Sequence, residues 1–119
     1  MWIAQKYIER PLLYRRRKFD IRLWALVTSD FKIYKFNQGY VRTTSEIYEA
    51  DSQDKFVHLT NQYLQNKSSS YSKHEEGNTI SFFDLQNFLD EAYGELNVNI
   101  EDHFIPRMQD IIIDTFLSG

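Results

Sequence analysis

The sequence contains no cysteine, and its 119 residues include only two prolines and four glycines. Without cysteine, the chain has neither a disulfide framework nor a thiolate metal site. No apolar run reaches the roughly 18 residues of a membrane span, and the first ten residues lack the apolar segment and cleavage site of a signal peptide. We therefore expect a soluble, cytoplasmic protein with no membrane partner.

The glycine-rich loops that commonly bind nucleotides are also missing. Neither the G-x-x-x-x-G-K-[ST] pattern of P-loops nor the G-x-G-x-x-G pattern of Rossmann folds occurs in the sequence. No G-x-S-x-G segment indicates a serine nucleophile, and His58, His74 and His103 have no second ligand at metal-binding spacing. Any nucleotide must be held in another way, and we expect no metal site made from this chain.

What the chain does contain is apolar mass and unevenly distributed charge. Hydrophobic residues make up 42% of it, with nine Phe and eight Tyr, which is enough for a packed core. Residues 1–45 hold ten Lys and Arg against three acids, whereas residues 46–119 hold four against fourteen. The basic half indicates an anionic partner, such as nucleotide phosphates, nucleic acid or an acidic polypeptide; alternatively, the two halves attract each other.

Alternating apolar and polar residues predict strands in the first half. The alternation is strict over residues 19–28, residues 31–37 are aromatic and β-branched, and residues 40–44 follow the turn at Gln38-Gly39. The leading segment is residues 2–8, with a corner at Arg10-Pro11. These features predict an antiparallel β meander.

The second half predicts a loop and two helices. Residues 66–78 are polar and read as a mobile surface loop. Ser81 and Asp84 have the spacing of a helix start, apolar residues follow at helical spacing, and Gly94 is placed to end that helix. A second amphipathic helix follows from Phe104 to Phe116, with Pro106 near its first turn. Strands followed by helices indicate an α+β fold.

Lys18, Asp20 and Arg22 are spaced by two, so a strand projects them to one face. Two cations beside a carboxylate can clamp phosphate oxygens, and Arg42 on the third strand can reach the same surface. The alternatives are a solvent face with cross-strand ion pairs and an arginine at a sheet edge. The basic run at residues 15–18 permits a nucleic-acid hypothesis, although most such runs are solvated loops.

Several blocks of the sequence resemble, in the same order, those of the tubulin-tyrosine ligase and ligase-like family. They are Gln5-Lys6-Tyr7-Ile8, Pro11-Leu12-Leu13, Arg17-Lys18-Phe19-Asp20-Ile21-Arg22, Val41-Arg42-Thr43-Thr44-Ser45-Glu46, His58-Leu59-Thr60-Asn61 and Tyr71-Ser72-Lys73-His74-Glu75-Glu76-Gly77-Asn78. Together they extend over about residues 2–117. The fourth and sixth blocks are more similar to the tyrosine-adding member than to the longer glutamylating and glycylating members.

The resemblance implies an ATP-grasp fold and an ATP-dependent ligase that joins Tyr, Glu or Gly to tubulin through an acyl-phosphate. It implies an ATP site of Gln5, Lys6 and Ile8 at the adenine, Lys18 at the phosphates, and Thr60 and Asn61 at the nucleotide or acyl-phosphate. Asp20, Arg22 and Arg42 would form the catalytic group. The partners implied are the acidic tail of tubulin and an amino acid, with a location at the cytoskeleton or the cilium and no nucleic acid.

The sequence also departs from the family pattern. The family's Mg²⁺ ligands belong to a later segment with an Asp and a Glu-x-Asn motif, and a preceding subdomain supplies another phosphate-contacting lysine. By the resemblance, residues 1–119 end before that later segment and begin after that subdomain. We therefore expect a partial ligase domain that is inactive alone, missing its N-terminal and C-terminal portions. The alternative is a non-catalytic tubulin-binding or scaffold protein with a degenerate ligase fold.

Overall fold

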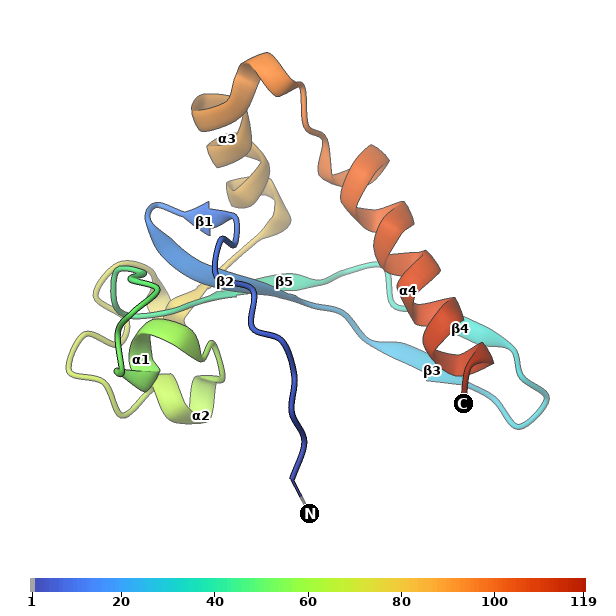
Figure 1. Ribbon diagram of the computed structural model, residues 1–119. Helices are drawn as coiled ribbons and strands as arrows, with labels where there is room; N and C mark the ends of the chain where they lie inside the picture. The colour runs from blue at the N-terminus through green and yellow to red at the C-terminus, as the bar shows by residue number, and fades with distance from the viewer. Residues whose placement is uncertain (1) are drawn as a thin grey trace. The chain divides into compact units, whose positions relative to one another are not determined.

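The computed structural model describes residues 2–119, and these fold as two compact units (Figure 1). The first unit comprises the described residues up to Asp20 together with Arg42–Asn78, and the second comprises Ile21–Val41 together with Thr79–Gly119. Strands β2 and β5 each contribute residues to both units. The predicted α+β class with antiparallel strands is confirmed.

The strands form two sheets. The bounds of the strands are β1 (Leu13–Tyr14), β2 (Arg17–Arg22), β3 (Ala25–Val27), β4 (Ile33–Lys35), β5 (Tyr40–Thr43) and β6 (Thr79–Ile80). One sheet has the order β1-β2-β5-β6, and the other is the pair β3-β4. The helices are α1 (Lys55–His58), α2 (Gln62–Gln65), α3 (Phe82–Tyr93) and α4 (Ile105–Leu117), with short turns η1 (Glu76–Asn78), η2 (Gly94–Leu96) and η3 (Ile100–Phe104).

The prediction of one continuous strand over residues 19–28 is wrong. Strand β2 ends at Arg22, and β3 begins at Ala25 in the other sheet. The strand order also departs from a simple meander, because β5 is hydrogen-bonded to β2 although it follows β4 in the sequence. Alternation reports which residues share a face, but it carries no information on which neighbour a strand pairs with, so a change of partner leaves no trace in the pattern.

A tight hairpin leads into β2. Tyr14 lies opposite Arg17, so the loop between β1 and β2 consists of Arg15 and Arg16 alone. Their φ angles are 46° and 66°. A two-residue loop of type I′ has positive φ at both positions, which normally favours Asn and Gly there. Two arginines in these positions are therefore conformationally unfavourable.

The polar segment 66–78 is only partly the mobile surface loop that its composition predicts. Asn78 is buried, and the side chain of Glu75 is 13% exposed and paired with Arg17. Two four-residue helices that the sequence did not predict, α1 and α2, precede this segment. The prediction from composition was wrong for these residues because their polar side chains form hydrogen bonds with residues distant in the sequence instead of with water.

In the second unit the predicted helix over residues 82–93 is confirmed. The side chain of Ser81 accepts from the backbone N–H of Asp84, whose carboxylate accepts from the backbone N–H of Ser81. This reciprocal pair is a capping box, and it satisfies two N–H groups that have no partner within the helix. Leu85 and Leu89 are buried on the inner face of α3.

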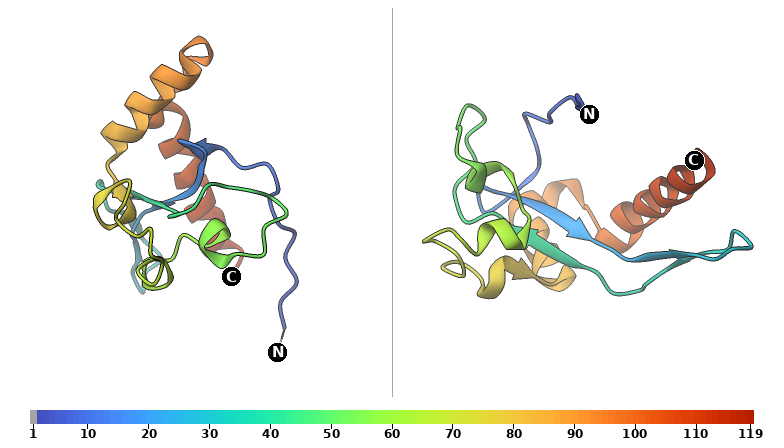
Figure 2. Two further views of the ribbon diagram at one scale, coloured as in Figure 1. Left: turned by 90° about the vertical axis from the view of Figure 1, so that its left-hand side faces the viewer. Right: turned by 90° about the horizontal axis from the view of Figure 1, so that it is seen from below.

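The predicted last helix is also present, with Pro106 in its first turn. A turn of π-helix, η3, precedes it, and Figures 1 and 2 show α3 and α4 as separate rods joined by residues 94–104. Ile105 is buried, whereas Ile111 and Phe116 on the predicted apolar stripe are 54% and 38% exposed. An open cavity of about 590 Å³ lies between β4 and α4, lined by Ile33, Tyr34, Ile112 and Ile113 among others. No helix in residues 2–119 is long and apolar enough to cross a membrane.

Candidate functional site

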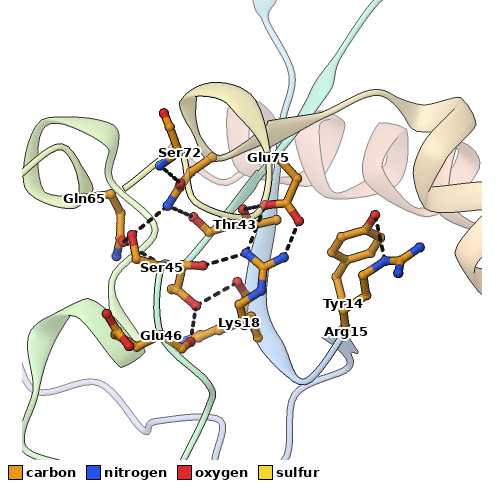
Figure 3. A network of polar contacts seen from close by, with 12 residues as sticks. Tyr14, Arg15, Lys18, Thr43, Ser45, Glu46, Gln65, Ser72 and Glu75 are labelled. Carbon is orange, nitrogen blue, oxygen red and sulfur yellow. Dashed lines mark hydrogen bonds and ion pairs between the residues drawn. The ribbon is translucent and has the colours of Figure 1, made fainter. Parts of the chain in front are cut away.

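The first unit contains a buried ion pair between Arg17 and Glu75, and Figure 3 labels Glu75 within the polar network around it. The Arg17 guanidinium, 2% exposed, donates from Nη1 to Glu75 Oε2 at 2.9 Å and to the Thr44 carbonyl at 2.9 Å, and from Nη2 to Glu75 Oε1. Thr43 Oγ1 donates to the same carboxylate at 3.0 Å. The interpretation of Arg17 as part of a solvated basic run is therefore wrong, because its charge is neutralised inside the fold.

Amide side chains continue this network away from the ion pair. Asn78 Nδ2 donates to the Thr43 carbonyl at 3.2 Å and to Ser45 Oγ at 2.9 Å. Gln65 Oε1 accepts from the Ser45 backbone N–H at 2.8 Å and from its hydroxyl at 2.7 Å (Figure 3). Among the described residues, no buried side-chain nitrogen or oxygen lacks a partner. A fully satisfied buried network of this kind fixes the geometry of the elements that it joins.

Next to this network, β2 and β5 bring Asp20 and Arg42 together. Arg42 donates from Nε to Asp20 Oδ1 at 2.8 Å and from Nη2 to Oδ2 at 2.5 Å, a bidentate ion pair. Thr60 Oγ1 donates to Asp20 Oδ2 at 2.7 Å. The expected proximity of Arg42 to Asp20 is confirmed. With Asp20 37% and Arg42 17% exposed, this group remains accessible from solvent, unlike the Arg17 pair.

A shallow cavity gathers most of the residues expected at the nucleotide. It has a volume of about 340 Å³ and is lined by Gln5, Lys6, Tyr7, Ile8, Pro11, Lys18 and Phe19. Its lining includes the apolar residues Ile8, Pro11 and Phe19 and the two basic residues Lys6 and Lys18. This combination of apolar residues and cations suits a flat ring carrying phosphates.

Two side chains near Lys18 were not predicted from the sequence: Tyr7 contacts Lys18 directly, and His58 contacts Tyr7. Lys18 Nζ donates to the hydroxyl of Tyr7 at 3.0 Å, and that hydroxyl is 2.7 Å from Nδ1 of His58. His58 Nε2 is 2.8 Å from the Ser52 carbonyl. Both residues lie inside blocks that carry the family resemblance, and this was the only signal that linked positions 51 residues apart.

The other expected site residues are placed differently. Asn61 caps α2, since its side chain accepts from the backbone N–H of Leu64 at 3.3 Å. Arg22 ends β2 in the second unit and is exposed, so its membership of the Asp20 group stays a prediction. The burial of Tyr48 raises its pKa, and its hydroxyl donates to the Glu9 carbonyl at 2.9 Å, which attaches the leading segment to the first unit.

Metal binding by the chain itself is not supported. Residues 2–119 contain no group of three or more His, Cys, Asp or Glu side chains that could hold a metal ion. His58 is occupied by Tyr7 and Ser52, and His103 Nδ1 lies 3.0 Å from the Asn99 backbone N–H.

Comparison with known proteins gives consistent matches over the whole chain. Tubulin glycylase 3D of Tetrahymena thermophila is 40% identical over 122 residues, covering 98% of this chain and 12% of that protein. The human protein named inactive polyglycylase TTLL10 is 34% identical, covering 98% of this chain and 18% of its own length. The probable alpha-tubulin polyglutamylase Ttll1 of Tetrahymena thermophila is 38% identical, covering 78% of this chain and 24% of its own length.

The chain thus spans less than a quarter of the length of each of these three relatives. The model of the tubulin-tyrosine ligase family matches residues 1–119 without a gap at either end. The resemblance seen in the separate sequence blocks is therefore confirmed: the chain belongs to the tubulin-tyrosine ligase family.

Proposed function

We propose that this chain is the nucleotide-binding and carboxylate-activating part of an ATP-dependent ligase that attaches an amino acid to tubulin. The observation that carries the proposal is that β2 contributes one residue to the cavity and another to the Asp20–Arg42 ion pair, both in the first unit. Lys18 lines the cavity that also contains Gln5, Lys6 and Ile8, and Asp20, two residues later, is paired with Arg42 and bonded to Thr60. The relatives support the substrate, because their names refer to tubulin.

The basic residues of the site suit a reaction that brings several negative charges together. ATP supplies the phosphoryl group that activates the acceptor carboxylate as an acyl-phosphate. Several negative charges then meet, so the protein contributes mainly positioning and charge neutralisation. In this proposal Lys18 contacts phosphate, Arg42 and Arg22 contact the anionic groups, and Asp20 holds the Arg42 guanidinium in one orientation. Thr60 fixes the Asp20 carboxylate, and Asn61 lies one residue further along at the nucleotide.

The apolar part of the site has a separate task. The backbone groups of Lys6 and Ile8 would hydrogen-bond the edge of the adenine ring, and Gln5 would contact it with its amide. These residues line the cavity whose walls also include Pro11 and Phe19. The ring would therefore sit on apolar side chains while its phosphates extend towards Lys18.

Magnesium does not fit the residues of this chain taken alone. Among residues 2–119 no cluster of acidic or histidine side chains could hold it. Asp20, two residues from Lys18 on β2, already accepts from Arg42 and Thr60. The proposed roles of the residues above therefore involve no metal ligand from this chain.

The amino acid transferred is proposed to be glycine. The relatives support this choice over tyrosine, because two of the three described above are named as glycylase or polyglycylase and none as a tyrosine ligase. The similarity of the RTTSE and YSKHEEGN blocks to the tyrosine-adding member stays a prediction. These blocks supply Thr43, Ser45, Glu75 and Asn78 to the buried network.

The second candidate is a tubulin-binding protein of this family that has lost turnover. One observation favours it specifically: the human relative at 34% identity is named as inactive. Such a protein would keep the fold and the basic surface and bind tubulin without ligating an amino acid to it. It would act at the cytoskeleton, as would the ligase.

One experiment separates these candidates. The full-length protein is incubated with tubulin, Mg-ATP and labelled glycine, glutamate or tyrosine, and incorporation is measured against a blank without ATP. The ligase proposal expects ATP-dependent incorporation of glycine, which Arg42→Met abolishes without unfolding the protein. Tubulin binding with no incorporation of any of the three amino acids would support the non-catalytic candidate and reject the ligase.

A further inference from the structure

We infer that Tyr7 and His58 are positioning residues that hold the ammonium group of Lys18 at the nucleotide cavity. The inference rests on the proposed role of Lys18 in contacting phosphate, and it assigns a task to two side chains that have none in that proposal. Its basis is a chain of three hydrogen bonds that runs from Lys18 through Tyr7 and His58 to the Ser52 carbonyl.

With His58 neutral, the chemistry of the groups gives every bond in this chain one direction. The Ser52 carbonyl can only accept, so His58 Nε2, 2.8 Å away, carries a proton and donates. In the neutral imidazole Nδ1 then has a lone pair, and it accepts from the Tyr7 hydroxyl at 2.7 Å. The Tyr7 oxygen in turn accepts from Lys18 Nζ at 3.0 Å. Each group therefore donates in the direction from Lys18 to Ser52, and each hydrogen bond polarises the next.

Packing restricts the same groups independently of their hydrogen bonds. The His58 ring lies between two tyrosines, with edge-to-face contacts to Tyr7 at 5.5 Å and to Tyr48 at 5.7 Å between ring centroids. Lys18 Nζ is 4.5 Å from the centroid of the Tyr7 ring. Tyr7 therefore holds the ammonium by its hydroxyl and by its ring, and His58 holds Tyr7 in the orientation that allows this.

This arrangement connects the two ends of the nucleotide cavity. Tyr7 stands between Lys6 and Ile8, whose backbone is assigned to the adenine, and Lys18 is assigned to the phosphates. The lysine side chain has four rotatable bonds and loses much rotamer freedom when it is held in one place. If the hydrogen bonds to Tyr7 restrict Lys18 before the nucleotide arrives, binding has less of this freedom left to remove.

Binding measurements on the full-length protein test the inference, with Mg-ATP and adenosine as the two probes. Adenosine lacks phosphates, so a residue that acts through Lys18 affects ATP and spares adenosine. We expect Tyr7→Phe to raise the Kd for ATP by about three- to tenfold, the range for losing one ordinary hydrogen bond, with adenosine unchanged. His58→Leu should do the same, and His58→Asn, which keeps an acceptor near the Nδ1 position, should recover part of the loss.

The matched control is Tyr63→Phe. Tyr63 is 73% exposed on α2 and has a lysine, Lys67, over its ring at 4.2 Å, but it belongs to neither the chain of hydrogen bonds nor the cavity. Loss of its hydroxyl should leave both Kd values unchanged. Thermal unfolding of each variant identifies any that fail to fold, and the comparison of His58→Leu with His58→Asn remains available if Tyr7→Phe does.

A double-mutant cycle with Lys18→Met decides whether Tyr7 acts through Lys18. If it does, adding Tyr7→Phe to Lys18→Met causes no further loss of ATP affinity. Additive losses, or equal losses for ATP and adenosine, overturn the positioning role. An unchanged ATP affinity in Lys18→Met rejects the phosphate assignment itself, and with it this inference. Independently of ATP, nitrogen NMR of His58 should report the Nε2–H tautomer, and the Nδ1–H tautomer would overturn the hydrogen-bond chain.

Discussion

Replacing Arg17 with methionine should be the most damaging change to the stability of the first unit. Methionine keeps most of the length of the side chain but removes the donor of all three hydrogen bonds to Glu75 and the Thr44 carbonyl. Glu75, 13% exposed, then keeps a hydroxyl partner in Thr43 but loses its counter-charge. Removing one partner of a buried ion pair costs about 3–5 kcal/mol. Domains of this size are stable by only about 5–15 kcal/mol, so much of the margin disappears.

Urea unfolding followed by far-ultraviolet circular dichroism measures this effect in the 119-residue chain. The control is Lys32→Met, which breaks an ion pair with Asp30 whose side chains are 67% and 57% exposed. That change should cost less than about 1 kcal/mol. The double change Arg17→Met with Glu75→Leu should recover part of the loss, because no unpaired charge remains buried. If Arg17→Met costs no more than Lys32→Met, the buried network does not stabilise the unit and the argument is wrong.

Three further changes test separate parts of the fold by the same unfolding measurement. Gly39→Ala should destabilise by about 1–3 kcal/mol, because a Cβ there would lie 2.7 Å from the Arg22 carbonyl oxygen and 2.5 Å from Leu23 Cδ2; no measurable loss would contradict this close approach. Arg16→Gly should stabilise the fold by about 0.5–1 kcal/mol, because glycine adopts the φ of 66° without strain; a loss of stability would mean that the contacts of the Arg16 side chain outweigh the relief of backbone strain. Ser81→Ala should cost about 1 kcal/mol at pH 7. The Ser81 hydroxyl and backbone N–H lower the pKa of Asp84 below 3.8, so this stabilisation is present above that pH and is lost as the pH falls through the lowered pKa; a cost independent of pH would exclude the carboxylate.

Features encoded by neighbouring residues were predictable from the sequence. Helix α3 was predicted with its start because Ser81, Asp84 and the apolar periodicity lie within a few residues of one another. The proximity of Asp20 and Arg42 was predictable because both lie on short strands separated by a single hairpin. In each case the sequence separation is small, or the intervening chain has only one simple path.

The buried network was not predictable by the same means. Arg17 and Glu75 are 58 residues apart, and Glu75 belongs to a polar segment whose composition resembles that of a solvated loop. Nothing local distinguishes Arg17 from Arg15 and Arg16, its neighbours in the basic run. The choice of which arginine becomes buried depends on the β1-β2 hairpin, which places Arg17 opposite Tyr14 and leaves the other two in the turn. Arg17 is therefore distinguished from Arg15 and Arg16 only by the pairing of the strands, which is a tertiary property.

Arg17 is buried whereas Arg15 and Arg16 are exposed, and this difference decides which arginines should be changed to test binding to the acidic tail of tubulin. Reversing all three arginines of the run would confuse two effects, because Arg17→Glu would put a carboxylate beside Glu75 inside the fold. Arg15→Glu with Arg16→Glu keeps Arg17 and reverses two exposed charges at the hairpin tip, at the loss of the 3.4 Å hydrogen bond from Arg15 Nε to the Tyr14 hydroxyl. Such charges act mainly on the rate of encounter and are screened over about 8 Å at physiological salt. We therefore expect the double reversal to weaken tubulin binding at low salt, to have less effect at high salt, and to leave ATP affinity nearly unchanged. An unchanged tubulin affinity at low salt would mean that this hairpin tip does not meet the acidic tail.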